Sequence, residues 1–219
     1  MEYEIKGVIN QTLAVSLEKG EGIWAGKGNI VSYDETLDWS VQTLGGVGRT
    51  VSRVLSGESI ALTRVTAREK GRVHFAAHEP GRIVSWNLEE AGEIVALRGA
   101  FLGAHGDIDI RATRARRVGA MVFGGGGLIL QMISGRGLVF LSVRGDLVDR
   151  RLEAGETLLV STGNLAAFSK SCDYKIRGVG GCLKMRLGGE GIFMTELTGP
   201  GRVLVQTLKR GQGRRNQAV

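Results

Sequence analysis

The sequence has little cysteine, proline or aromatic side chain, and it has no long apolar run. Its 219 residues include two cysteines and two prolines, and aromatic residues make up 5%. Two cysteines are too few for a disulfide framework, and a chain of this length can fold without one. No apolar run approaches the roughly 18–20 residues of a membrane helix. The first residues, MEYEIKGVINQ, carry charges where a signal peptide needs an apolar segment, so we expect a cytoplasmic protein without a transmembrane segment.

Glycine, by contrast, is abundant. It occurs 35 times, which is more than twice its average share of about 7%. Collagen needs a strict three-residue period and disorder needs few apolar residues, whereas 42% of this chain is hydrophobic. Glycine between short apolar runs is typical of tight turns that connect strands. The composition therefore predicts an all-β protein.

The formal net charge is +7, which favours an anionic partner. Part of this charge lies in the C-terminal stretch LKRGQGRRNQAV, among polar residues and chain breakers. We interpret residues 209–219 as a basic disordered tail whose charge mainly serves solubility.

Two independent sets of sequence markers repeat three times. One set comprises LSGESIALTRVTAREKGRVHFAA, FGGGGLILQMISGRGLVFLSV and LGGEGIFMTELTGPGRVLVQT, whose predicted turn glycines are Gly71, Gly137 and Gly201. The other comprises LEKGEGIWAGKGNIV, LEEAGEIVALRGAFL and LEAGETLLVSTGNLA, which end near Gly28, Gly99 and Gly163. Both sets have periods of 64–71 residues. We therefore predict three tandem β units, at 1–76, 77–142 and 143–208.

The three units should form one compact body. A single unit cannot bury its apolar face alone, so we expect the units to share a core. Arrangement about a pseudo-threefold axis is a closed solution that protects strand edges. One short helix is predicted at residues 47–56, where GVGRTVSRVLSG places valines at helical spacing and a glycine at the end.

Three stretches carry a resemblance to a known family. LSGESIALTRVTA, PGRIVSWNLEEAGEIVALRGAFLGA and GGGGLILQMISGRGLVFLSVRG resemble the signature stretches of the altered inheritance of mitochondria (mitochondrial biogenesis) family. The similarity runs from about Tyr3 to Leu208. It implies repeated sandwich units in a fold like that of the tryptophan RNA-binding attenuation protein. For the mitochondrial members it implies a part in inner-membrane organisation rather than catalysis, and it supplies no functional residues.

Familiar catalytic and nucleotide-binding motifs are absent from the sequence. GIWAGKG fails as a phosphate loop, because the motif needs glycine where Glu21 stands and a hydroxyl where Gly28 stands. GGVGRTV lacks the third glycine of a dinucleotide fingerprint, and no serine lies in a Gly-x-Ser-x-Gly elbow. We predict neither a cofactor nor an enzymatic activity.

The remaining reactive side chains are interpreted as structural. His74, His78 and His105 have no spacing that fixes them together, so we expect satisfied or solvated histidines rather than a zinc site. Cys172 and Cys182 are expected to be reduced apolar side chains. A repeated carboxylate falls at the predicted turns in all three units, which suggests a role in the turns rather than an acid/base pair; its members are Glu21, Glu93 and Glu156.

The best candidate for a binding site is a basic cluster of Arg111, Arg114, Arg116 and Arg117. Strand alternation would place Arg114 and Arg116 on one face and Arg117 on the other. This cluster could bind an anion, but it is more typical of a solvated surface. Few aromatics accompany it, and single-stranded RNA usually needs aromatic stacking platforms as well as charge.

Three functions remain open. We favour a non-catalytic scaffold that binds a protein partner or associates with itself, because the repeats carry no polar site chemistry. RNA or another polyanion is the first alternative, from the positive charge and the arginine cluster. A small-molecule or lipid-binding module with a cavity between units is the second.

Overall fold

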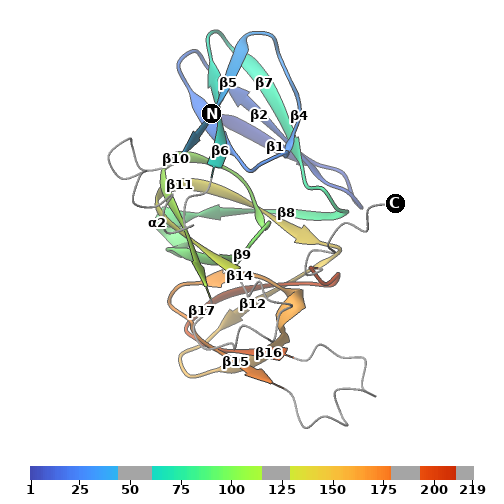
Figure 1. Cartoon of the computed structure of the whole chain (residues 1–219), viewed down its shortest axis with the longest axis vertical. Helices are drawn as coiled ribbons and strands as arrows, with labels where there is room; N and C mark the ends of the chain where they lie inside the picture. Colours follow the sequence, from blue (N-terminus) through green and yellow to red (C-terminus); the bar gives the residue numbers. More distant parts are fainter. Residues whose placement is uncertain (44–60, 115–128, 179–192, 211–219) are drawn as a thin grey trace.

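The computed structural model describes residues 1–43, 61–114, 129–178 and 193–210 (Figure 1). Within these ranges the chain is mostly β-strand, as predicted. The predicted helix at 47–56 lies outside them. The helical segments that are described are α2 (Leu88–Ala91) and a 3-10 turn, η1 (Thr162–Asn164). Asn87 begins α2, because its side chain accepts a hydrogen bond from the Glu89 backbone N–H at 3.0 Å.

The strands follow one another through the three predicted units. The first unit contains β1 (Glu2–Lys6), β2 (Thr12–Leu17), β3 (Gly22–Ala25), β4 (Ile30–Tyr33), β5 (Leu37–Thr43), β6 (Ala61–Ala67) and β7 (Gly71–Ala76). The second contains β8 (Gly81–Asn87), β9 (Ile94–Leu97), β10 (Phe101–Arg114) and β11 (Ile129–Arg144). The third contains β12 (Leu147–Leu152), β13 (Thr157–Ser161), β14 (Leu165–Ser169), β15 (Asp173–Gly178), β16 (Phe193–Thr198) and β17 (Gly201–Gln206).

These strands form open antiparallel sheets. One has the order β1-β2-β7-β4, and another has the order β13-β16-β15. A ten-stranded sheet, β12-β17-β14-β9-β11-β10-β3-β6-β5, runs between them, with β8 paired to β11. In Figure 1 the strands of the first unit lie at one end of the longest axis and β15 and β16 lie at the other. The predicted pseudo-threefold closure is not confirmed, and the unit boundaries stay a prediction.

One pairing scheme nevertheless recurs along the chain. The last strand of each unit pairs on both sides: β7 with β2 and β4, the C-terminal half of β11 with β8 and β10, and β17 with β12 and β14. The strand before it does the same: β6 with β3 and β5, the first half of β11 with β9 and β10, and β16 with β13 and β15.

The predicted turn at Gly137 is wrong. Gly71 and Gly201 begin β7 and β17, but Gly137 lies inside the continuous strand β11, opposite Gly106 of β10. Both glycines have positive φ, at 133° and 117°. A Cβ on Gly137 would lie 2.1 Å from the His105 carbonyl oxygen, so glycine lets the two backbones cross closely without a break in pairing.

A β-bulge recurs at the same place in each unit. The register shifts between Ile30 and Ser32, between Phe101 and Gly103, and between Leu165 and Ala167. A bulge adds one residue to one strand and bends it. The bulged residues are therefore Val31, Leu102 and Ala166.

Neighbouring units are joined by strand pairing at these bulges. β3 pairs with β10, with Trp24 opposite Ala104, and β9 pairs with β14, with Val95 opposite Phe168. The Gly26 backbone N–H extends the first junction by donating to Leu102 O at 2.9 Å. The Asn29 amide also donates to Leu102 O, at 3.2 Å. Each junction thus pairs the strand that precedes the bulged strand of one unit with the bulged strand of the next.

The apolar core forms three clusters, and each borrows from a neighbouring unit. Leu102 and Phe140 of the second unit pack into the cluster of Leu13, Ile23 and other residues of the first. Ala166 and Leu204 of the third unit pack with the second-unit cluster in the same way. The expected sharing of apolar contacts between units is therefore local, from one unit to the next. Beyond this core, Arg210 of the predicted tail contacts the second unit, because its Nη2 donates to Ser142 O at 2.6 Å.

Replacing Leu102 tests this packing between units. Leu102→Ala should lower the free energy of unfolding by about 2–5 kcal/mol, because it opens a cavity at a fully buried position. Val31→Ala is the matched control, since Val31 occupies the same bulge but is 62% exposed, and should cost less than about 0.5 kcal/mol. Urea unfolding followed by circular dichroism measures both. Equal losses of unfolding free energy in the two variants would contradict the packing of Leu102 into the core of the first unit.

Candidate functional site

The predicted arginine cluster is described only in part. Arg111 lies on β10, where it is exposed and its Nε forms an ion pair with Asp109 Oδ2 at 2.6 Å. Arg114 is the last residue of β10. Arg116 and Arg117 lie outside the described residues. The cluster stays a prediction, and its described member already has a carboxylate partner.

The histidines are dispersed. His74 Nδ1 shares a hydrogen bond with Ser32 Oγ at 3.1 Å, and His105 Nδ1 donates to Gly22 O at 3.0 Å. Across the described ranges, no three histidine, cysteine or acidic side chains come together as metal ligands. Cys172 is a buried free thiol, and burial, followed by nearby Asp173, raises its pKa. Cys182 lies outside the described residues.

The repeated glutamates act in turns in two of the three units. Glu21 Oε2 accepts a hydrogen bond from the Glu18 backbone N–H at 2.9 Å, and Glu156 Oε2 accepts one from Glu153 N–H at 2.9 Å. Glu93 instead pairs with Lys170, which joins β9 to β14. The Glu18 N–H and the N-terminal ammonium lower the pKa of Glu21.

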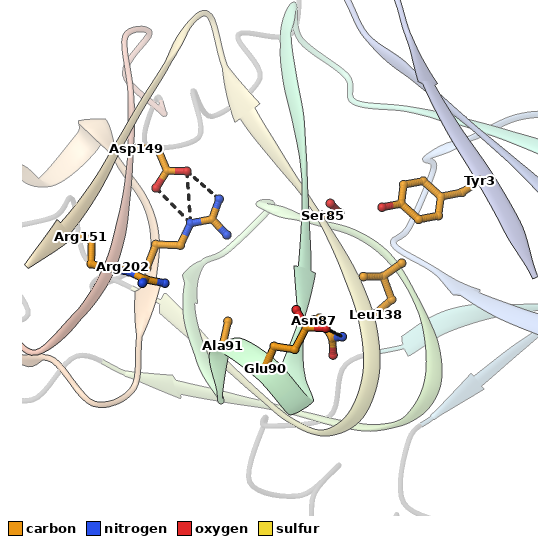
Figure 2. A pocket seen from close by; sticks show the side chains of 9 residues that line it. All are labelled: Tyr3, Ser85, Asn87, Glu90, Ala91, Leu138, Asp149, Arg151 and Arg202. Atoms are coloured by element: carbon orange, nitrogen blue, oxygen red, sulfur yellow. Dashed lines mark hydrogen bonds and ion pairs between the residues drawn. The ribbon is translucent and has the colours of Figure 1, made fainter.

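A polar groove of about 600 Å³ opens on the side of the middle unit (Figure 2). Its walls come from all three predicted units, through strands β1, β8, β11, β12 and β17 and helix α2. Its lining residues are Tyr3, Ser85, Asn87, Glu90, Ala91, Leu138, Asp149, Arg151 and Arg202.

The main charge in the groove is compensated. Arg202 Nε donates to both Asp149 carboxylate oxygens, at 3.0 and 3.2 Å, and its Nη2 bonds Oδ2 at 2.6 Å (Figure 2). The same guanidinium lies 4.9 Å from the centre of the Trp86 ring. Two partners thus hold Arg202, and the carboxylate competes with any anionic ligand for it.

The opposite walls are fixed by a side-chain hydrogen bond and by packing. Asn87 Nδ2 donates to Glu90 Oε1 at 2.9 Å, which holds both side chains at the start of α2. The Tyr3 ring packs edge-on against Phe140, with ring centres 4.9 Å apart. The groove has donors and acceptors for a polar ligand, but its described groups do not form a nucleophile–base pair.

A second candidate surface is apolar and lies on the first unit. We call Tyr33, Trp39 and Val41 the end patch. Trp39 is 53% exposed, and its Nε1 donates to the Tyr33 hydroxyl at 3.0 Å. Val41 lies two residues further along β5, on the same side of the strand as Trp39, and is also exposed. Large side chains gathered in this way are typical of binding surfaces.

A smaller groove, of about 340 Å³, lies on the third unit. It follows β13 and continues between β12 and β17. Its apolar walls include Val148, Leu158, Leu159, Val160 and Val205. We call it the β13 groove.

Comparisons with known proteins identify the family. The model of the family described as "Mitochondrial biogenesis AIM24" matches residues 3–208. The chain belongs to this family. An uncharacterised protein of Streptococcus pyogenes serotype M6 is 28% identical over 206 residues, which covers 90% of this chain and 82% of that protein.

A solved structure shares the fold of this family member. The crystal structure of a Streptococcus pyogenes protein matches with a TM-score of 0.78 and 24% identity, over 95% of this chain and 94% of that one. The resemblance to the mitochondrial biogenesis family is thereby confirmed, whereas the likeness to the tryptophan RNA-binding attenuation protein stays a prediction. Among the described residues, no helix has the length and apolarity to cross a membrane.

Sequence reasoning missed both grooves and the end patch. The side groove combines residues up to about 200 positions apart, such as Tyr3 and Arg202, so no local motif marks it. Tyr33 and Trp39 are close in sequence and aromatic in a chain poor in aromatics, which was a usable signal for the end patch.

The lowered pKa of Glu21 predicts a pH effect on stability. The stabilisation from a depressed carboxyl pKa is present above the unfolded value and is lost as pH falls through the folded value. Glu21→Gln should therefore be less stable than wild type near neutral pH, and the difference should shrink at about pH 3. Denaturant unfolding at both pH values measures this. A difference independent of pH would contradict it, and acetylation of the N-terminus should weaken the effect.

The compensated charge in the side groove predicts a gain of anion binding. Asp149→Ala should raise the affinity for inorganic phosphate roughly tenfold, because Arg202 then offers its guanidinium to the ligand. Isothermal titration calorimetry measures the change. The double variant Asp149→Ala, Arg202→Ala is the control and should lose the gain. If Asp149→Ala leaves the affinity unchanged, the carboxylate does not control access to Arg202.

Proposed function

We propose that this family member is a non-catalytic interaction scaffold of the cytoplasm that binds other protein chains. The end patch carries the proposal. It presents Tyr33, Trp39 and Val41 to solvent on paired strands, although apolar side chains of this size are normally buried.

The chemistry of the end patch suits a protein partner. Tryptophan and tyrosine dominate the energetics of protein interfaces, because they bury a large area at little entropic cost and keep one polar group. The Trp39–Tyr33 hydrogen bond holds the two rings in place before a partner arrives. Rigid, pre-arranged aromatic side chains lower the entropic cost of binding.

The described charges give less support to a polyanion partner. Arg202 is paired with Asp149, and Arg111 is paired with Asp109. A nucleic-acid surface needs several cations that can neutralise phosphates, together with stacking platforms for single strands. The protein-binding role is therefore the one that the geometry favours.

Retention of partners from a cell lysate tests the role of the end patch. Trp39→Ser should lower the retention of a specific partner at least about tenfold, since loss of an interface tryptophan commonly costs about 2 kcal/mol or more. Leu208→Ser is the matched control, because Leu208 is also exposed but lies away from the patch. Nuclease treatment of the lysate should leave retention unchanged. Equal retention by wild type and Trp39→Ser, or loss on nuclease treatment, would contradict the proposal.

A further inference from the structure

The two junctions between units follow one rule of strand pairing. Two of the described strands lack the partner that this rule predicts for them. β3 pairs with β10, and β9 pairs with β14, so the strand that precedes the bulged strand in one unit pairs with the bulged strand of the following unit. By this rule β13 would pair with the bulged strand of a following unit and β4 with a strand of a preceding one, and neither partner is among the described strands. Among the described strands, β13 pairs with β16 alone and β4 pairs with β7 alone.

Burial at equivalent positions changes from the inner junctions to the two ends. The bulged residues Leu102 and Ala166 have 0% exposure, whereas Val31, the bulged residue of β4, is 62% exposed. The strands that pair with the bulged strands show the same change in exposure. Val95 is buried against Phe168, whereas Leu159, which also lies four residues before the marker glycine of its unit, is 56% exposed. Both ends thus present apolar side chains where an inner junction would cover them.

The β13 groove lies where a following unit would pack. The first-unit cluster receives Leu102, and the second-unit cluster receives Ala166. In the third unit, the groove exposes Val148 and Leu159 instead. Val148 occupies the position on β12 that Leu13 occupies on β2, because each lies four residues before the leucine that pairs with the first glycine of the last strand. Leu13 is fully buried. The groove walls are mainly apolar, as an apolar bulged residue of another unit requires.

The charges on the sheet edges agree with this reading. Charged residues on an edge strand oppose pairing with another chain. The other outer strands of the described sheets all carry them: Glu2, Glu4 and Lys6 on β1, Asp38 on β5, Arg82 on β8, Asp149, Arg150 and Arg151 on β12, and Asp173, Lys175 and Arg177 on β15. β4 and β13 carry none. The two strands left over by the junction rule are also the two without this protection.

We propose that copies of this chain associate head to tail, with β4 of one copy pairing with β13 of the next. In the register of the inner junctions, Tyr33 lies opposite Leu159, and Val31 enters the β13 groove. The two surfaces differ, so the interface is heterologous and generates a ring or an open chain of copies. This goes beyond the proposed binding of other proteins, because the partner is a second copy of the chain.

The association is weaker than an inner junction. The first residue after the bulge pairs with an apolar residue in both inner junctions: Gly103 pairs with Phe140, and Ala167 pairs with Leu204. On β4 the equivalent pair is polar, because Ser32 pairs with His74. The Ser32–His74 hydrogen bond makes this face more polar, and a polar pair buries less apolar area. Copies therefore assemble at high concentration and separate on dilution.

Variants that block one end each give a sharp test by sedimentation velocity. Wild type should form species larger than the monomer at high concentration. Val31→Lys blocks β4 and Leu159→Lys blocks β13, and each alone should associate at least about a hundredfold more weakly, because an unpaired charge in a dry interface is heavily penalised. Mixed in equal amounts, they should form dimers and nothing larger, since one intact β13 meets one intact β4.

The mixture also separates the proposal from its competitors. Val8→Lys, at an exposed residue in the loop between β1 and β2, should behave as wild type, because β7 separates these strands from β4. A monomeric wild type, a single-end variant that still forms dimers, or a mixture that stays monomeric would overturn the proposal. Dimers in the mixture also show that both variants are folded. A monomeric chain with Trp39-dependent retention of another protein overturns head-to-tail association alone, whereas assembly without such retention overturns the scaffold role alone.

Discussion

The structure depends on one contact that recurs between units: a bulged strand pairs with the preceding unit and places its bulged side chain in that unit's core. Backbone pairing sets the register, since Trp24 faces Ala104 in one junction and Val95 faces Phe168 in the other. The buried bulge residue then excludes water from the core edge. Neither part suffices alone, because a short paired edge is weakly specified and a small core is only marginally stable.

The recurrence of this contact explains which features the sequence predicts well. Glycine markers and the Leu-Glu starts report turns, and turn chemistry is local. The repeated glutamate is one such marker. In two units its carboxylate accepts a hydrogen bond from the backbone N–H three residues earlier, as Glu21 and Glu156 do. All-β character and the family resemblance therefore follow from short stretches of sequence.

The features that failed or were missed depend on partners distant in sequence. Gly137 aligns with two turn glycines, yet the pairing of β11 with β10 keeps it inside a strand. The apolar core has three clusters, and the pairing of one unit with the next decides which side chains each cluster contains. The side groove joins Tyr3 to Arg202, and no periodicity links residues so far apart. Register between units, rather than propensity, decides all three.

Equivalent positions in a repeat need not have equivalent roles. Val31, Leu102 and Ala166 share one bulge and similar apolar chemistry, but two of them fill a neighbouring core and one faces solvent. The difference comes from position in the array and not from the side chain itself. A terminal unit in such an array either carries a polar, capping face or keeps the apolar face of an inner unit. β4 and β13 lack charge while the other described outer strands carry it, which is the pattern of an inner junction and not of a capping face.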